Sequence, residues 1–373
     1  MSKLRVLVTG GAGFIGSHLA EALLERGHAV CVIDRLVPQV HHSGGPRYLP
    51  DGVEFLQGDV TDPDLMARAV DGVDAVFHQA AEVGVGQSMY EIGRYVRANA
   101  LGTAVLLEAL LPHRDHIQKL IVASSMSIYG EGAYRCPEHG EVDPGLRPPE
   151  QLLSRAWEAA CPRCGLALTP LPTPESKRLA PASVYAVTKQ DQEQYCLVVG
   201  RAYGIPSVAL RYFNVYGPRQ SLSNPYTGAC AIFSSRLLNG KSPLIFEDGR
   251  QARDFVHVSD IVRANLLALE HDTLDYQAVN IGTGEPTSIL ELAQLLAKLL
   301  GVDLEPELVG QYREGDIRHC IADISLARDG LGFTPGLAVA DGLADLVDWA
   351  REQHAVDDVA RATSELADRG LVR

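Results

Sequence analysis

An apolar segment that runs directly into regularly spaced glycines is the strongest constraint on how this chain can fold. Residues 4–9 read Leu-Arg-Val-Leu-Val-Thr, and Gly10, Gly13 and Gly16 follow at once. Glycines allow a sharp turn after a buried strand and let the next helix pack closely against that strand. The sequence therefore predicts a strand at 4–9 and a helix at 14–26.

Strand and helix patterns alternate over most of the first 212 residues. The further predicted strands are 29–34, 53–57, 75–78, 119–123 and 207–212, and the further predicted helices are 63–70, 90–110 and 185–203. This alternation predicts an α/β fold with a doubly wound parallel sheet.

Beyond residue 213 the pattern is mixed and predicts a second, smaller α/β lobe. We expect the first lobe to comprise 1–213 and 254–285 and the second lobe to comprise 214–253 and 286–345. The segment 131–183, rich in proline, glycine and charge, reads as an insertion in the first lobe. The tail, 346–373, is expected to form a surface helix without a catalytic role.

Composition excludes several classes of partner. The chain has 373 residues, 46% of them hydrophobic, and a formal net charge of −14. That charge argues against nucleic acid or an anionic membrane as the main partner. No window is apolar enough for a membrane span, and the N-terminus already reads as a core strand, not a signal peptide. We therefore expect a cytoplasmic protein with reduced cysteines.

The glycine turn is typical of a site for a dinucleotide pyrophosphate, which would meet the N–H groups at the start of the following helix. Asp34 ends the second predicted strand, where a carboxylate binds a ribose diol and repels a 2′-phosphate. The pattern thus favours NAD over NADP, although the neighbouring Arg35 weakens that preference. Asp59 either lies near the adenine or caps a helix. The predicted cofactor contacts in this region are Gly10, Gly13, Phe14, Ile15, Gly16, Asp34, Asp59, Val60, Ala80 and Ala81.

Three polar side chains predict acid–base chemistry beside that cofactor. Tyr185 and Lys189 are four residues apart, so a helix places them on one face. An ammonium near the phenol, together with the positive nicotinamide, would lower the tyrosine pKa from about 10. Such a spacing alone also fits a surface pair, but Ser125 follows a predicted strand at the sheet edge where ligands bind.

Together these motifs resemble the extended short-chain dehydrogenase/reductases, and specifically the NAD-dependent sugar-nucleotide epimerase/dehydratase family, over about residues 3–345. The resemblance implies a Rossmann fold and a catalytic set of Ser125, Tyr185 and Lys189. Ser125 and Tyr185 would contact the substrate, and Tyr185 and Lys189 would contact the cofactor. It further implies that Asn99 supports the active site and contacts the cofactor.

The resemblance also implies a small-molecule nucleotide-sugar substrate. Segments similar to the family's diphosphate loop and nucleotide-binding stretches would supply Asn214, Arg219, Arg253 and Arg318. Arginine suits phosphate because its planar fork binds two oxygens at once. For Arg253 and Arg318 a salt bridge to a local acid is the alternative.

A departure from the family pattern narrows the reaction. In the 4,6-dehydratase branch an acid pair follows the catalytic threonine, whereas Met126 and Ser127 follow Ser125 here. This favours 4-epimerisation through a 4-keto intermediate. A 4-ketoreductase, a uronic-acid decarboxylase and a non-catalytic NAD-binding regulator remain as alternatives. The segment 224–228 and the long Ser125–Tyr185 separation are similar to bacterial dTDP-L-rhamnose 4-epimerases and related 6-deoxysugar enzymes. Helices 90–110 and 185–203 would form a homodimer interface, as in the family.

The insertion carries two pairs of soft metal ligands, Cys136 with His139 and Cys161 with Cys164, separated by 21 residues. Two such pairs suit a closed tetrahedral zinc site, which is structural and not catalytic. Zinc would order an insertion that has little core of its own. Reduced surface thiols and a disulfide are the alternatives. We expect the insertion to frame the sugar pocket.

Overall fold

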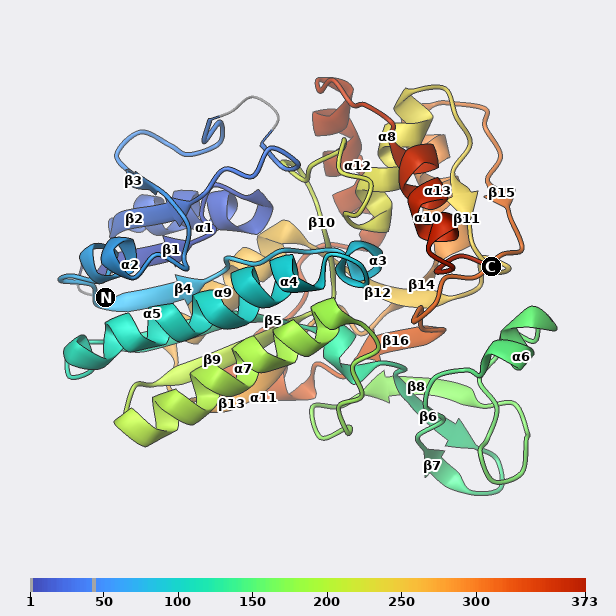
Figure 1. Cartoon of the computed structure of the whole chain (residues 1–373), viewed down its shortest axis with the longest axis horizontal. Helices are drawn as coiled ribbons and strands as arrows, with labels where there is room; N and C mark the ends of the chain where they lie inside the picture. Colours follow the sequence, from blue (N-terminus) through green and yellow to red (C-terminus); the bar gives the residue numbers. More distant parts are fainter. Residues whose placement is uncertain (1–2, 42–44) are drawn as a thin grey trace.

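The computed structural model describes residues 3–41 and 45–373. Its larger sheet has seven parallel strands in the order β13-β9-β5-β4-β1-β2-β3 (Figure 1). The strands are β1 (Arg5–Thr9), β2 (Ala29–Asp34), β3 (Glu54–Gln57), β4 (Ala75–His78), β5 (Lys119–Ser125), β9 (Ser207–Tyr212) and β13 (Gln277–Ile281). The order reverses between β1 and β4, and ligands of such sheets bind at the carboxyl ends of the strands at that reversal. The predicted doubly wound α/β fold is confirmed.

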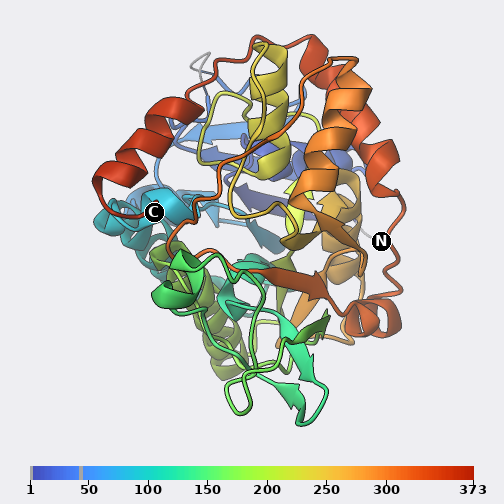
Figure 2. The same cartoon turned by 90° about the vertical axis from the view of Figure 1, so that its right-hand side faces the viewer.

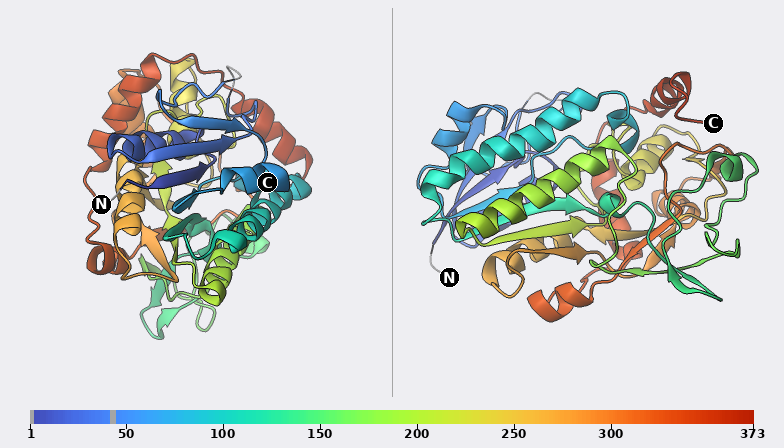
Figure 3. Two further views of the ribbon diagram at one scale, coloured as in Figure 1. Left: turned by 90° about the vertical axis from the view of Figure 1, so that its left-hand side faces the viewer. Right: turned by 60° about the horizontal axis from the view of Figure 1, so that its bottom comes forward.

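Helices cover both faces of this sheet, as Figures 1 and 3 show. The first face carries α1 (Phe14–Glu25), α9 (Val258–Glu270) and α11 (Ser325–Leu331), and the second face carries α2 (Pro63–Ala69), α5 (Gly102–Leu110) and α7 (Val184–Tyr203). Successive strand side chains point to opposite faces, so Val6 and Val8 belong to one core and Leu7 to the other. Both faces are therefore apolar, which explains the almost continuous apolar strands in the sequence.

Helix α7, which carries two predicted catalytic residues, has clear signals at both ends. The Ser183 hydroxyl accepts a hydrogen bond from the backbone N–H of Ala186 at the N-terminus. Gly204, with φ of +72°, ends the helix in the left-handed conformation that glycine adopts without strain. Tyr185 and Lys189 thus lie in the first turns, at the end of the helix nearest the strands' carboxyl ends.

The predicted helix 90–110 is not one regular helix. It consists of α4 (Ile92–Tyr95), a π-helical turn (Val96–Leu101) and α5, followed by a short 3-10 turn at Leu111–His113. A π-turn adds one residue to the helical circuit and is frequent at functional sites. Here the turn contains Asn99, which is fully buried.

A second sheet has the order β10-β12-β16-β8-β6-β7, with β14 paired to β12. Its strands are β10 (Asn214–Tyr216), β12 (Ala252–His257), β14 (Pro286–Ser288), β16 (His319–Ala322), β6 (Ala133–Cys136), β7 (Gly140–Val142) and β8 (Thr169–Thr173). The core beside it is formed with α8 (Ala229–Leu238), α10 (Ile289–Leu300) and α12 (Val339–Arg351).

This sheet shifts two expected lobe assignments. The sequence assigned 254–257 to the first lobe, but β12 pairs with β10 and β16 in the second sheet. The sequence also treated 131–183 as part of the first lobe, yet β6, β7 and β8 extend the second sheet. The physical reason is pairing between distant strands, which local pattern does not reveal. Figure 2 shows the insertion, in green, projecting from one end of the molecule.

The remaining short elements are α3 (Val85–Ser88), α6 (Pro149–Leu153), a 3-10 turn at Met126–Tyr129, the paired strands β11 (Leu244–Ile245) and β15 (Glu307–Leu308), and the terminal α13 (Val359–Asp368). In Figure 2 the red α13 lies beside the cyan segment that contains α3. Among the helices of the described residues, none is long and apolar enough to cross a membrane.

Candidate active site

A cavity of about 620 Å³ extends from the glycine turn after β1 to the second sheet. It is lined by the ends of β2 and β5, the start of α7, and segments around β10, β11, β12 and α13. Its position at the carboxyl ends of the parallel strands is the expected ligand site of this fold. It contains these predicted residues: Gly10, Gly13, Phe14, Ile15, Gly16, Asp34, Asp59, Val60, Ala80, Ala81, Ser125, Tyr185, Lys189, Asn214 and Arg253.

The glycine turn is too tight for side chains at two positions. Gly10 has φ of +67°, and its N–H donates to the Ile33 carbonyl at 2.7 Å. A Cβ atom on Gly16 would lie 2.3 Å from the Gly10 carbonyl oxygen. Glycine at both positions therefore lets α1 begin directly beneath the turn, with its first N–H groups at the cavity.

The carboxylate of Asp34 is held at the cavity wall by the backbone N–H groups of Ala12, at 3.2 Å, and Leu36, at 2.9 Å. The neighbouring Arg35 is engaged in ion pairs. Its guanidinium donates to Asp59 at 3.1 Å and also binds Glu82. An arginine engaged by two carboxylates is poorly available for a 2′-phosphate, so the arrangement suits a free ribose diol.

Asp59 does not cap a helix. Its carboxylate accepts hydrogen bonds from the Thr61 N–H at 2.9 Å and from the Thr61 hydroxyl at 3.0 Å. Burial raises the pKa of Asp59, but these bonds and Arg35 outweigh burial and lower it. The helix-capping carboxylate is instead Asp62, which accepts from the N–H groups of Asp64 and Leu65 at the start of α2.

Ser125, Tyr185 and Lys189 all line the cavity. The Ser125 oxygen accepts hydrogen bonds from the N–H of Ser127 at 3.2 Å and from its hydroxyl at 2.9 Å. Since both of these bonds are donated to Ser125, its own hydroxyl hydrogen is free for the nearby Tyr185 oxygen, an interaction that lowers the pKa of that phenol. The two hydroxyls can therefore hold the same substrate oxygen.

The electrostatics of the tyrosine differ from the expectation. Burial raises the pKa of Tyr185, and the Ser125 hydrogen bond offsets this only in part. For Lys189, burial disfavours the charged amine and therefore lowers the pKa to about 7. The predicted lowering of the tyrosine pKa is thus absent in the protein alone, because desolvation disfavours both charged forms in the same pocket.

A buried polar layer holds these groups in place. Lys189 Nζ donates to Gln192 Oε1 at 2.8 Å, and Gln192 Nε2 donates to Thr103 Oγ1 at 3.0 Å. Asn99 lies in this layer and not at the cavity surface. Its amide accepts from the Glu82 N–H at 2.7 Å and donates to Thr188 Oγ1 at 2.9 Å. Asn99 therefore ties α7 to the loop after β4 and, unlike the other residues predicted to contact the cofactor, does not line the cavity.

Arg219 and Arg318 are two of the four residues predicted from the diphosphate loop and the nucleotide-binding stretches, and they lie outside the cavity lining. Arg219 donates to Glu21 on α1 at 2.6 Å. Arg318 is fully buried and binds Glu158, Glu247 and Asp248. For Arg318 the alternative stated from the sequence, a salt bridge to acids, is the observed one.

The other two do line the cavity. The Oδ1 atom of Asn214 is buried and has no hydrogen-bond partner within the described ranges 3–41 and 45–373. Arg253 donates to the Ile317 carbonyl at 2.7 Å, to the Arg318 carbonyl at 2.9 Å and to Asp316 at 3.3 Å. The Asn214 oxygen can thus accept a hydrogen bond from a ligand, whereas much of the Arg253 guanidinium already donates hydrogen bonds within the protein.

Sequence reasoning missed two parts of the cavity wall. Arg313 stacks on Phe246, with its guanidinium carbon 4.8 Å from the ring centroid, and both residues line the cavity. Arg313 lies five residues before Arg318, and it lines the cavity whereas Arg318 does not. The tail also contributes, since Ala362, Thr363 and Leu366 of α13 line the cavity.

The tail does form a largely exposed helix, but this helix also lines the cavity, which the sequence did not predict. The Glu365 carboxylate accepts from the Tyr226 hydroxyl at 2.8 Å and from the Tyr90 hydroxyl at 3.2 Å. The guanidinium of Arg369 lies 4.1 Å from the Tyr90 ring centroid. These contacts fix α13 over the cavity, and the sequence offers only its amphipathic pattern as a signal.

The four predicted metal ligands lie together in the insertion. The ligand atoms of Cys136, His139, Cys161 and Cys164 are all within 4.8 Å of one another. They belong to the β6–β7 hairpin and to the turn before β8, away from the cavity lining.

Comparison with known proteins gives a consistent result. A profile of the NAD dependent epimerase/dehydratase family matches residues 6–150 and 167–282. A dTDP-L-rhamnose 4-epimerase of Burkholderia thailandensis is 35% identical over 94% of this chain and 95% of its own length. A UDP-N-acetyl-alpha-D-glucosaminuronate decarboxylase of Bacillus cytotoxicus is 31% identical over 94% of this chain and 98% of its own length. The crystal structure of a Thermus thermophilus UDP-glucose 4-epimerase in complex with NAD is similar with a TM-score of 0.74, at 32% identity, covering 94% of this chain and all of that one.

Proposed function

Because this chain belongs to the NAD-dependent epimerase/dehydratase family, we propose that it is a sugar-nucleotide 4-epimerase that works through a 4-keto intermediate. One observation carries the proposal: Ser125, Tyr185 and Lys189 share a cavity with the glycine turn, and the two residues after Ser125 carry neither an acid nor a base. Hydride and proton transfer need only these groups, whereas dehydration also needs an acid and a base for the departing water.

The residues divide the work at the sugar 4-hydroxyl. Tyr185 Oη takes the hydroxyl proton and later returns it, while Ser125 donates a hydrogen bond to the same oxygen. Lys189, fixed by Gln192, supplies positive charge that favours the phenolate. NAD supplies the acceptor and then the donor of the C4 hydride. The proton and hydride that leave the sugar both return, the hydride to the opposite face, so no net oxidation occurs.

We propose that the resident cofactor is NAD and not NADP. The ionic engagement of Arg35 by Asp59 and Glu82 supports this, as does the Asp34 carboxylate at the ribose position. Titration with NAD and NADP compares the two directly, and tighter binding of NADP would contradict the assignment. Replacing Asp34 by alanine should narrow the difference in affinity between NAD and NADP.

The substrate that we propose first is dTDP-L-rhamnose or a related 6-deoxyhexose nucleotide. The similarity to the Burkholderia enzyme and the 224–228 segment at the cavity support it. Proton NMR of the purified protein with dTDP-L-rhamnose, and in parallel with UDP-glucose, tests the proposal without added cofactor. A new anomeric signal with altered H4 coupling is the expected result with one of them.

The same samples separate the alternatives. A 4-ketoreductase consumes NADH in proportion to product, and a decarboxylase releases carbon dioxide from UDP-glucuronate. Tyr185→Phe serves as the control that should lower turnover by about 10²–10⁴-fold while it keeps NAD bound. Binding of nucleotide sugars without turnover of any, with NAD supplied, would refute the epimerase and favour the non-catalytic regulator.

We further propose a homodimer through α7 and the α4–α5 segment. Large apolar side chains are exposed on these helices, namely Ile92, Val96, Leu101, Val187, Tyr195, Val198 and Tyr203. Val198, 61% exposed, lies on the same helix as the catalytic pair but on its outer side. A Val198→Glu variant should elute as a monomer in light-scattering chromatography. A wild-type monomer at micromolar concentration would contradict the proposal.

A further inference from the structure

The cysteine–histidine cluster of the insertion has the dimensions of a metal site. Cys136 Sγ lies 3.5 Å from His139 Nδ1 and 3.6 Å from Cys164 Sγ, and Cys161 Sγ lies 3.6 Å from His139 Nδ1. A tetrahedral zinc ion, with bonds of about 2.3 Å to sulfur and about 2.0 Å to nitrogen, separates its ligand atoms by about 3.5–3.8 Å. These three distances fit that tetrahedron, the remaining ligand atoms lie within 4.8 Å of one another, and all of these cysteines are free thiols.

The backbone around the cluster also fits thiolate ligands. The N–H of Gly165 donates to the Cys161 carbonyl and the N–H of Cys161 donates to the Leu166 carbonyl, both at 2.8 Å. Gly165, with φ of +75°, lets the chain make this tight turn. The turn brings Cys161 and Cys164 to the same point, as a pair of metal ligands requires.

The insertion has too small an apolar core to hold this geometry unaided. Its buried cluster is made of only Tyr134, Cys136, Ala159, Cys161 and Leu168, with Val142 against it. Two of these five are ligands of the candidate site. In such small units a structural metal supplies the folding free energy that apolar burial does not.

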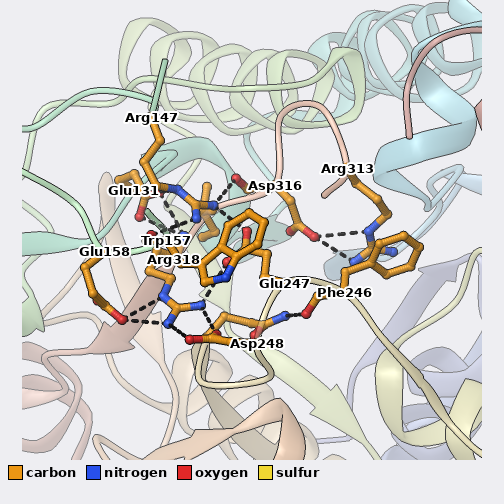
Figure 4. A network of polar contacts seen from close by, with 12 residues as sticks. Glu131, Arg147, Trp157, Glu158, Phe246, Glu247, Asp248, Arg313, Asp316 and Arg318 are labelled. Carbon is orange, nitrogen blue, oxygen red and sulfur yellow. Dashed lines mark hydrogen bonds and ion pairs between the residues drawn. The ribbon is translucent and has the colours of Figure 1, made fainter. Parts of the chain in front are cut away.

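The cluster is connected to the cavity wall by an ion-pair network around the fully buried Arg318, and Figure 4 shows this network. Glu158, three residues before Cys161, binds Arg318 at 2.6 Å and His319 at 3.1 Å. Arg318 in turn binds Glu247 at 2.8 Å and Asp248 at 2.7 Å. These two acids follow Phe246, one of the cavity-lining residues.

A second branch of the network starts from the same insertion. Arg147 binds Glu247 at 2.8 Å and donates to the carbonyl of Asp316 at 3.0 Å. The Asp316 carboxylate holds Arg313 at 2.8 Å, and Figure 4 shows Arg313 lying over Phe246. Both branches of the network thus end at the wall of Phe246, Arg313 and Asp316, which we call the distal wall.

We propose that Cys136, His139, Cys161 and Cys164 bind one structural zinc ion, and that this ion holds Glu158 and Arg147 so that they position the distal wall. The ion closes the β6–β7 hairpin onto the turn that follows Glu158. It thereby restricts the insertion to the one arrangement in which both branches form. The second half of this inference rests on the proposed function, because a nucleotide-sugar substrate bound in the cavity would place its nucleoside diphosphate beside the distal wall.

The test begins with metal content. Purified wild-type protein should contain one zinc per chain by inductively coupled plasma mass spectrometry, and cobalt exchange should give the intense visible bands of tetrahedral thiolate coordination. A Cys161→Ser/Cys164→Ser variant should lose the metal. Cys31→Ala, which removes a buried thiol of the first sheet, should keep it. Absence of zinc after purification with zinc supplied, or a disulfide within the cluster by mass spectrometry, would overturn the site.

The second measurement separates the role of the site from the function. Calorimetric titrations of the double variant with UDP, dTDP and NAD should show nucleoside diphosphate binding weaker by about tenfold and NAD binding unchanged. Retained NAD binding also shows that the first sheet is folded. Unchanged binding of both diphosphates would overturn the link to the distal wall. If zinc and the diphosphate effect are found but no sugar nucleotide is turned over, the proposed function fails and the metal inference stands.

Discussion

Replacing Gly10 by alanine should destabilise the fold in two ways, through backbone strain and through a steric clash. Gly10 has φ of +67°, and an alanine there costs about 1–2 kcal/mol for the left-handed backbone. Its Cβ would also lie 2.7 Å from the Ala80 Cα and 2.8 Å from the Ala80 nitrogen. Backbone atoms yield little, so this overpacking adds about 1–3 kcal/mol. We expect Gly10→Ala to lower the free energy of unfolding by about 2–5 kcal/mol in total.

Gly27→Ala is the matched control. Gly27 has φ of +82°, but a Cβ there would meet nothing within 4 Å, so only the backbone cost of about 1–2 kcal/mol applies. Urea unfolding of both variants gives the two free energies, with equal m-values required for the comparison. Because Gly10 and Ala80 both line the cavity, Gly10→Ala should also weaken NAD binding, whereas Gly27→Ala should not. Equal losses in the two variants, with equal NAD affinity, would refute the close-approach argument.

Three further outcomes are expected. Tyr185→Phe should lower kcat, measured as turnover by NMR, by about 10²–10⁴-fold. NAD affinity, measured by calorimetry, should change little. Near-normal turnover would show that Tyr185 does not transfer the proton. Hydrogen bonds from His319 and Arg318 hold the pKa of Glu158 at about 2, below its ordinary 4.5, so its carboxylate stabilises the fold above pH 4.5 and loses this effect as the pH falls toward 2. The gap in unfolding free energy between wild type and Glu158→Gln should therefore be constant above pH 5 and narrow below it, and a gap that widens in acid would contradict the sign. Buried Lys119 binds Asp275, whose side chain is 17% exposed, and Asp272, whose side chain is 88% exposed. In urea unfolding, Asp275→Asn should therefore lower the free energy of unfolding by about 1–3 kcal/mol and Asp272→Asn by less than about 1 kcal/mol. A larger loss for Asp272→Asn than for Asp275→Asn would contradict this reasoning.

The first sheet and its glycine turn could be predicted because their signals are local. Most strands of the first sheet are apolar runs, and a helix such as α7 is bounded by Ser183 and Gly204 in the sequence itself. The proposed catalytic pair, Tyr185 and Lys189, was singled out by its spacing within that helix, and Ser125 by its place at a strand end. These features need no knowledge of what lies across the molecule.

What sequence reasoning missed depends on pairing between distant segments. Arg253 and Arg318 occur in similar polar stretches, but only the structure brings Glu158, Glu247 and Asp248 around Arg318. A buried guanidinium with three carboxylates has no free donors for phosphate. The place of α13 was missed for the same reason, since Tyr90 and Tyr226, which bind it, lie more than 130 residues away.

The ion-pair network has a consequence for chimeras built from members of this family. An insertion that projects from a domain is a natural choice for deletion, or for transfer as a unit to a related protein. Excision of 131–169 here would leave Arg318, which is fully buried, without Glu158, and Glu247 without Arg147. Arg147 and Glu247 are both buried, and breaking such a pair costs about 3–5 kcal/mol, a large share of the stability of a typical domain. A successful transplant must therefore carry Glu247, Asp248 and Arg318 along with the segment, and a clean deletion must replace all three by apolar residues.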